Sequence, residues 1–332
     1  MRRISLIAVA IVVAAGVVAA VAGASTNGTT LSLVGYSTPK TVMSKIIQLW
    51  QQTPAGKDVS FTTSYGPSGD QARAVAAGLR ADAVFLSTGL DVNTLVDAGL
   101  VDRGWQGQSY GGSEAYSVVV FAFRGGNPKH IRTWNDLVKP GVQIVTPNPF
   151  SSGSAKWNVL AAYAAARHQG KSDKQARAFV QTLFKHVVSQ DSSGRNATNT
   201  FLAGKGDVLL TYESEAVDAQ QAGQSIAYLV PSETMLIELP IAPVKTSSNL
   251  DLVKKFIAFT KTAPAQDLLA QAGFRPVLKS VTKKYRSKFP TRALVTIGNP
   301  MFGGWRKVDK RWFDPKSGLM VGIEKAVGGP TG

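Results

Sequence analysis

Two patterns of hydrophobic and polar positions alternate along the chain. Short runs rich in β-branched and aromatic residues predict strands over residues 31–36, 59–64, 82–87, 116–123, 142–147, 207–212 and 237–244. Stretches with apolar residues at helical spacing predict helices over residues 39–52, 69–79, 91–98, 153–168, 172–184, 198–204, 213–222, 250–262 and 264–271. Strands that alternate with helices indicate an α/β fold with parallel sheets.

Small polar residues stand at several strand-to-helix junctions. Four junctions share this feature: SYGPSGDQ, NPFSSGSAKWN, DSSGRNAT and LLTYESEA. In the first, Ser68 followed by Gln71 predicts a capping box. Each junction alone is explained by a serine N-cap. Together they favour one anion site, because helix starts offer free amides to anions and open α/β sheets bind ligands at the carboxyl ends of their strands.

The first 24 residues have the pattern of a signal peptide. Arg2 and Arg3 precede an apolar run over residues 4–21, and the small residues at 22–24 predict cleavage after Ala24. The apolar run is also close to the roughly 20 residues that span a bilayer, so an uncleaved anchor is the alternative. Both interpretations predict a periplasmic or other extracytoplasmic location.

The composition argues against several classes of protein. The 332 residues include no cysteine, which excludes thiol catalysis and thiolate metal sites. The three histidines have no partners at ligand spacing, and neither a GxSxG nor a phosphate-binding loop is present. We therefore expect no metal, no cofactor and no catalytic residue.

The charge balance is strongly basic. The chain has 37 Lys and Arg residues against 21 Asp and Glu, and removal of residues 1–24 takes away two arginines, which leaves a net charge of +14. These basic residues are scattered, without an arginine-rich run or a basic stripe with interleaved aromatic residues. The charge therefore favours small anions and predicts no nucleic-acid partner.

Several motifs are similar to those of the sulfate- and thiosulfate-binding proteins of bacterial ABC importers. These motifs are YGPSGDQA, GNPKHIRTWNDLVKPGVQIVTPNPFSSGSAKWN, DSSGRNATNTF, GDVLLTYESEA, FRP and FGGW, and they span about Leu31 to Phe313. The resemblance implies a type II periplasmic-binding fold, in which each of two α/β lobes has a mixed, mostly parallel sheet flanked by helices. It implies one lobe from residues 25–112 and 240–332, a second from 113–239, and hinge strands near 112–117 and 236–243.

The resemblance also implies which residues contact the ligand. In that family neutral donors hold the anion, and the matching positions are Ser37, Ser68, Ser152, Gly153, Ser154, Gly194 and Tyr212. Tyr212 stands where the family usually has a tryptophan that donates to the anion. The charged residues expected around these positions are Asp70, Arg73, Lys156 and Arg195. Asp70 would repel a dianion unless Arg73 or Lys156 compensates its charge.

The resemblance implies a monomeric receptor that performs no reaction and delivers sulfate or thiosulfate to a membrane permease with its ATPase. A lining of donors alone rejects phosphate, whose proton needs an acceptor, whereas a carboxylate of Asp70 in the cleft would favour phosphate. The alternatives are a molybdate or tungstate receptor of the same fold, an exported ester hydrolase, and a basic adhesin or nucleic-acid-binding protein.

Overall fold

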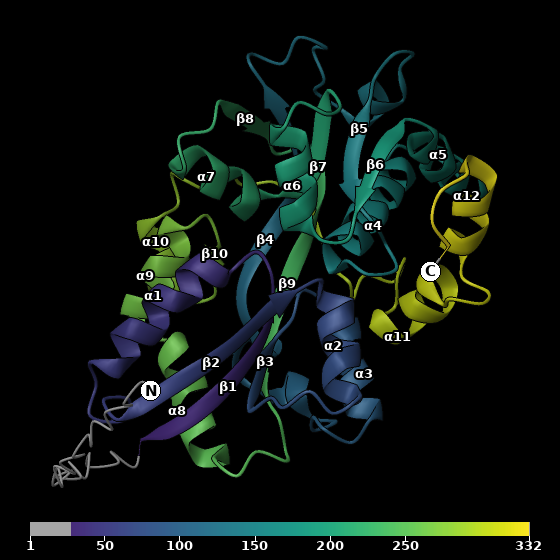
Figure 1. The fold of residues 1–332 in the computed structure, drawn as a ribbon. Helices are drawn as coiled ribbons and strands as arrows, with labels where there is room; N and C mark the ends of the chain where they lie inside the picture. Colours follow the sequence, from purple (N-terminus) through teal and green to yellow (C-terminus); the bar gives the residue numbers. More distant parts are fainter. Residues whose placement is uncertain (1–27, 332) are drawn as a thin grey trace, which may run out of the picture.

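One mixed β-sheet runs through the molecule, and helices cover both of its faces (Figure 1). The computed structural model describes residues 28–331, so the predicted signal peptide lies outside the described residues. Along the sheet the strands follow the order β2-β1-β3-β9-β4-β7-β5-β6. This order is not sequential, because the chain passes from one half of the sheet to the other and back.

The first lobe surrounds three parallel strands. Its elements are β1 (Thr29–Tyr36), α1 (Lys40–Gln51), β2 (Val59–Gly66), α2 (Ser68–Ala76), β3 (Ala83–Phe85) and α3 (Gly89–Asp97). Successive side chains of a strand point to opposite faces. Leu33 accordingly packs in the cluster that includes α1, and its neighbour Val34 packs in the cluster of α2 and α3.

The second lobe repeats this layered arrangement. Its elements are β5 (Ile144–Pro147), α4 (Gly153–His168), α5 (Asp173–Lys185), β6 (Val187–Asp191), α6 (Gly194–Leu202), β7 (Val208–Tyr212), α7 (Glu213–Gln221) and β8 (Ile226–Leu229). β5 pairs with β6 and β7 in parallel. The α4 helix is buried along almost its whole length, because α5 and aromatic side chains of the C-terminal segment cover the side that the sheet does not.

Two long antiparallel strands connect the lobes. They are β4 (Ser113–Arg124) and β9 (Glu233–Pro243), paired from Ser113 opposite Pro240 to Val118 opposite Leu236. The end of β9 then pairs with β3 in the first lobe, and the second half of β4 pairs with β7 and β8 in the second. These strands lie where the crossover strands were expected.

After β9 the chain returns to the first lobe and then crosses to the second. The intermediate elements are α8 (Leu250–Thr260), α9 (Ala263–Gln271), β10 (Arg275–Pro276), α10 (Lys279–Lys284) and β11 (Ala293–Val295). The C-terminal tail, residues 298–331, contains α11 (Trp305–Val308), a π-helix (Asp309–Phe313) and α12 (Leu319–Val327). α11 contacts α3 of the first lobe and α12 contacts α5 of the second (Figure 1).

The predicted elements largely match the observed ones, with α4 at the predicted residues 153–168. The helix expected over residues 198–204 begins earlier, at Gly194, because the Ser193 side chain accepts a hydrogen bond from the Asn196 amide and caps it. β6 and β8 were not predicted; in both strands the side chains are mostly half-buried, so they lack the fully apolar run of a central strand.

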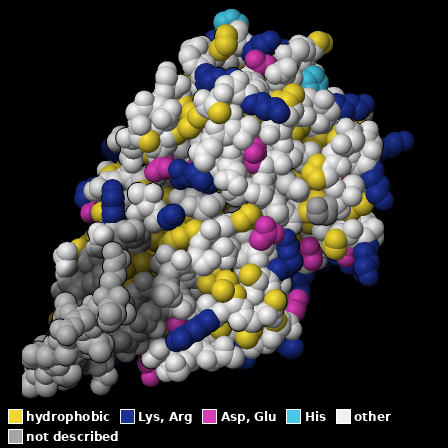
Figure 2. All heavy atoms as spheres, viewed as in Figure 1, with side chains coloured by type: hydrophobic (Ala, Val, Ile, Leu, Met, Phe, Trp, Pro, Cys, Tyr) yellow, Lys and Arg dark blue, Asp and Glu magenta, His cyan; other side chains and the backbone are white. Residues whose placement is uncertain are grey.

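The described residues contain no helix with both the length and the apolar character needed to span a bilayer. On the face shown in Figure 2, Lys and Arg side chains are spread across the surface, with acidic side chains between them. The basic charge therefore forms no continuous stripe on this face.

Candidate ligand-binding site

A small cavity lies where the two lobes meet, with about 190 Å³ of empty volume. It is bounded by the end of β1, by the loop after β3 and by the starts of α2, α4 and α6. Its lining residues are Tyr36, Ser37, Thr38, Gly66, Pro67, Ser68, Ser87, Ser152, Gly153, Ser154, Ser193 and Gly194. None of these residues is ionised at neutral pH. The cavity therefore presents hydroxyl and backbone N–H groups without a formal charge.

The structure brings most of the predicted ligand residues together. Six of the seven line this cavity: Ser37, Ser68, Ser152, Gly153, Ser154 and Gly194. The seventh, Tyr212, is fully buried behind the lining, and its hydroxyl lies 2.8 Å from Ser87 Oγ. Tyr212 is thus connected to the cavity through Ser87, which sequence reasoning did not identify.

The start of α4 explains the small residues of the NPFSSGSAKWN junction. Ser152 occupies the N-cap position, yet its side chain makes no capping hydrogen bond. Its hydroxyl is therefore available to the cavity that Ser152 lines. A Cβ atom at Gly153 would collide with Ser87 Oγ, so only glycine lets this helix start approach the loop after β3. The amides of the first helical turn have no acceptor within the helix.

The start of α2 differs from the prediction. The capping box of Ser68 and Gln71 is absent: Pro67 is the N-cap residue, and Gln71 bonds to Ser64. The Ser68 hydroxyl instead donates to Asp91 Oδ2 at 2.6 Å and accepts from the Ser87 amide at 2.9 Å. These buried partners outcompete the local cap, because an unpaired buried carboxylate is costly. The Ser68 amide remains at the cavity.

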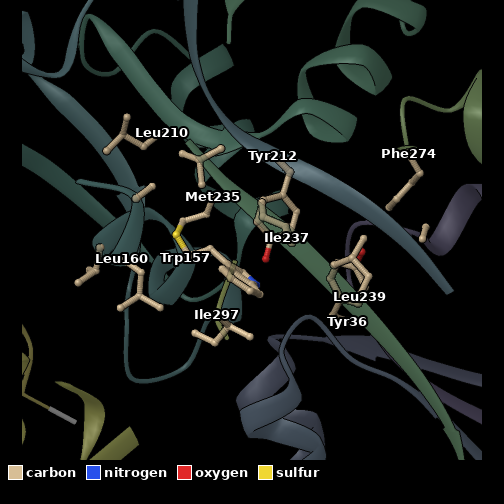
Figure 3. Close-up of a cluster of buried hydrophobic side chains, with 14 of the residues drawn as sticks. Tyr36, Trp157, Leu160, Leu210, Tyr212, Met235, Ile237, Leu239, Phe274 and Ile297 are labelled. Atoms are coloured by element: carbon tan, nitrogen blue, oxygen red, sulfur yellow. The ribbon is translucent and has the colours of Figure 1, made fainter. Parts of the chain in front are cut away.

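Direct hydrogen bonds close the two lobes on each other around the cavity. The Gly69 amide donates to Ser151 O at 3.0 Å. The Trp157 indole N–H donates to Ser87 O at 2.8 Å. The hydroxyl of Ser87 is also hydrogen-bonded to the hydroxyl of Tyr212. Figure 3 shows Trp157 and Tyr212 together in the buried cluster, with the phenol oxygen turned toward the Trp157 side. The structure is therefore a closed form.

The charged residues expected around the site are neutralised by protein partners. Asp70 pairs with Arg73, with 46% and 58% of these side chains exposed, and neither residue lines the cavity. Lys156 does not compensate Asp70; it lies 3.4 Å from Asp91, and both side chains are at least 95% buried. The Asp70 carboxylate therefore does not provide an acceptor for a proton on the ligand.

Arg195 is also paired within the protein. Its guanidinium lies 3.2 Å from Glu215 and 2.6 Å from Asp218, and it donates to Thr38 O at 3.4 Å. Burial acts against its charge, but these two carboxylates outweigh that effect and raise the pKa of Arg195. Burial raises the pKa of Glu215, and Arg195 opposes the rise. Arg195 therefore supports the end of β1 and leaves no free charge at the cavity.

The buried phenols remain protonated at neutral pH. Burial raises the pKa of Tyr212 well above its ordinary value, and the Ser87 hydroxyl opposes the rise. Burial also raises the pKa of Tyr36, whose hydroxyl has no hydrogen-bond partner within residues 28–331. Both phenols are thus hydrogen-bond donors.

The sequence analysis did not predict every residue that lines the cavity, and Ser87 is the most important residue that it missed. The segment FLSTGLD has the signal that marked the other junctions, a strand that ends in small polar residues before a helix. β3 ends at Phe85 and α3 begins at Gly89, so Ser87 lies in this junction. Applied to every junction, the same criterion would have found it.

Comparisons with known proteins identify the family of this chain. The family profile described as bacterial extracellular solute-binding protein matches residues 31–275. The sulfate-binding protein of Synechococcus elongatus is 36% identical over 318 residues, 92% of this chain and 90% of the relative. The thiosulfate-binding protein of Pseudomonas aeruginosa is 32% identical over 275 residues, 80% of this chain and 82% of the relative.

A solved structure shows the same architecture. The sulfate-binding protein SubI from Mycobacterium tuberculosis superposes with a TM-score of 0.83 and 44% sequence identity, over 86% of this chain and 100% of that one. The profile match and these identities show that the chain belongs to the family of bacterial extracellular solute-binding proteins, with the type II periplasmic-binding fold.

Proposed function

We propose that the protein is an exported receptor that binds sulfate or thiosulfate between its lobes and delivers it to the permease and ATPase of an ABC importer. The observation that carries the proposal is the lining of the cavity, which offers donors from three helix starts and no charged side chain. The names of the relatives support the same ligand class. The receptor acts as a monomer and catalyses no reaction.

The energetics of a buried dianion require many donors. Burial of an isolated divalent anion costs tens of kcal/mol, so nearly all of its oxygens must accept hydrogen bonds. About seven charge-assisted bonds of roughly 1.5–3 kcal/mol each supply about 10–20 kcal/mol, which leaves micromolar affinity after ordering costs. The helix dipoles of α2, α4 and α6 add favourable potential, because their positive ends meet at the cavity.

Closure of the lobes completes the site. The first lobe supplies Ser37, Ser68 and Ser87, and the second lobe supplies the starts of α4 and α6. Rotation about β4 and β9 separates these two groups of donors and releases the anion to the permease. Export follows cleavage after Ala24, which removes residues 1–24.

Isothermal titration calorimetry of the purified mature protein tests the proposal. Sulfate, thiosulfate, molybdate and phosphate are titrated separately, and the tightest ligands then compete at equal concentration. We expect micromolar or tighter binding of sulfate or thiosulfate and weaker binding of molybdate. A protein that binds none of the four anions overturns the proposal, and preferential binding of molybdate assigns the alternative ligand.

A further inference from the structure

The densest run of positive charge in the sequence lies in residues 279–292, which we call the basic segment. It forms α10 and the turns that lead to β11. In Figure 1, α10 lies beside α9 at the edge of the molecule. The segment has no acidic residue, and its six basic residues are Lys279, Lys283, Lys284, Arg286, Lys288 and Arg292. It is thus an exception to the scattered distribution of the other basic residues.

Three of the six basic side chains are used within the protein. Lys284 pairs with Asp267 of α9 at 2.8 Å. Lys288 donates to two carbonyl oxygens at the end of α9, at 2.9 and 2.7 Å. Arg292 donates to Val230 O at 3.3 Å. These contacts hold the basic segment against α9 and against the end of the second lobe's sheet.

The other three basic side chains have no such role. Lys279, Lys283 and Arg286 are exposed, and none of them makes a hydrogen bond or an ion pair through its side chain within residues 28–331. Lys279 and Lys283 stand four residues apart on α10, where like charges repel each other. These three charges therefore do not stabilise the fold, and they are free to meet an anionic partner.

The aromatic residues of the basic segment face the protein. Tyr285 and Phe289 stand between basic residues in the sequence, and sites for single-stranded nucleic acid use such aromatic residues to stack bases. Here both rings pack in a small hydrophobic cluster with Ala270 and Val281, and Phe289 is buried. They offer no stacking platform. The segment thus presents positive charge alone, which fits a partner recognised by its charge density.

We propose that the basic segment binds the surface of an anionic phospholipid membrane through Lys279, Lys283 and Arg286. A bilayer presents phosphate groups across a plane and needs no cavity to be recognised. Each Lys or Arg near such a surface strengthens binding by about fivefold. The inference rests on the proposed function for its setting, because a receptor that delivers its ligand to a permease works at the membrane. Binding through this segment holds the receptor close to its permease.

The triple variant K279Q/K283Q/R286Q tests the proposal and keeps every internal contact of the basic segment. The mature protein is sedimented with vesicles of phosphatidylcholine that contain about 30% phosphatidylglycerol, at about 50 mM and about 300 mM NaCl. We expect the wild type to bind these vesicles at low salt, to dissociate at high salt, and not to bind vesicles of phosphatidylcholine alone. The triple variant should bind at low salt roughly 100-fold more weakly than the wild type, since three charges are removed.

The matched control removes the same number of charges elsewhere. Lys174 of α5, Lys205 before β7 and Lys325 of α12 are also exposed and form no ion pair within the described residues. The variant K174Q/K205Q/K325Q therefore has the same net charge as the test variant. Its vesicle binding should stay within about threefold of wild type, because charges distant from the membrane contribute little.

Three results would overturn the proposal: no binding of the wild type to anionic vesicles, equal binding to neutral vesicles, or equal losses in the two triple variants. Retention on single-stranded DNA that falls in the test variant alone, with vesicle binding unchanged, would assign the segment to nucleic acid and also overturn it. Calorimetric titration of each variant with sulfate shows that the fold is intact. A wild type that binds anionic vesicles but no sulfate contradicts the proposed function instead, so the two failures are distinguishable.

Discussion

Ser152 is the N-cap residue of α4, but its side chain makes no capping hydrogen bond. Its replacement by alanine removes a donor from the cavity and no bond from the fold. We expect Ser152→Ala to weaken sulfate binding by about 5- to 150-fold, the equivalent of roughly 1–3 kcal/mol. The free energy of unfolding without ligand changes by less than about 0.5 kcal/mol. Calorimetry and urea denaturation measure the two quantities.

A second serine provides the matched control for Ser152. Ser172 accepts from the Gln175 amide in a complete capping box at the start of α5, far from the cavity. Ser172→Ala is expected to lower the free energy of unfolding by about 0.5–2 kcal/mol and to leave affinity unchanged. If Ser152→Ala behaves like Ser172→Ala, Ser152 is a structural cap and not a ligand residue.

Lys156 and Asp91 form a buried ion pair near the cavity. The pair is almost fully buried and joins α4 to α3 across the lobes. Lys156→Met leaves Asp91 without its counter-ion, and we expect it to lower the free energy of unfolding by about 3–5 kcal/mol. The exposed lysine of the Lys139–Asp136 pair is the control, for which a loss below about 1 kcal/mol is expected. Equal losses in urea denaturation would contradict this role.

Local sequence signals found the residues whose role depends on their own helix start. The stretch from Ser152 to Ser154 is an example, because free first-turn amides follow from a helix boundary alone. Ser87 has the local junction signal in FLSTGLD and was overlooked. The partner of Lys156 was not found, because its role depends on a contact between segments far apart in the sequence. The capping box at Ser68 failed for the same reason, since Asp91 competes for the hydroxyl.

Among the elements, β4 is unusual because a carboxyl side chain is buried at its start. Glu114 is fully buried, and its Oε2 lies 2.6 Å from Thr260 Oγ1. Thr260 Oγ1 also lies 2.8 Å from Ile257 O. The Thr260 hydroxyl donates to Glu114 Oε2, and the Gln266 side-chain amide donates to Glu114 Oε1 at 3.3 Å. Glu114 thus attaches β4 to the end of α8.

The pH dependence of stability follows from this arrangement. Burial raises the pKa of Glu114 to about 8, and Thr260 and Lys261 oppose the rise. The folded state therefore holds the proton more tightly than the unfolded state. Its stabilising effect is complete below the unfolded pKa of 4.5 and is lost as the pH rises through about 8.

Glu114→Gln removes this titration and keeps an uncharged group whose oxygen can accept from Thr260. Relative to wild type, the variant should gain on the order of 2–4 kcal/mol between pH 5 and pH 9. Urea denaturation of both proteins at each pH gives the difference, which cancels the contributions of the other carboxyls. A difference that stays constant with pH would show that Glu114 is charged in the folded state.

The spacing of apolar residues predicted most helices and strands, because each of these elements has a side that packs in the core. Edge strands such as β6 were not predicted, because their side chains are half-buried on both sides and apolar and polar residues therefore alternate only weakly. The C-terminal tail has short elements and many turns, and its path depends on surfaces that other segments create. Its position across both lobes therefore could not be derived from local pattern.

At the scale of the whole molecule, the tail links the two lobes beside the cavity. The Trp305 ring would meet a Cβ at Gly89 and lies near Trp105 in the first lobe. It also packs edge-on against Trp157 of α4, at 4.7 Å between ring centroids. Trp157 in turn donates to Ser87 O. Trp305 thus stabilises the closed arrangement of the cavity as well as the fold.

A comparison of two tryptophans of the tail separates the contribution to lobe closure from the contribution to the stability of the fold. Trp312 is equally buried but contacts Tyr163 of the second lobe, with ring centroids 4.9 Å apart. Both Trp305→Ala and Trp312→Ala should lower the free energy of unfolding by about 3–5 kcal/mol. Only Trp305→Ala should also weaken sulfate binding, by about tenfold, because it removes contacts that exist only between closed lobes. Equal affinities of the two variants in calorimetry, at a temperature where both are folded, would mean that the tail stabilises the lobes without favouring their closure.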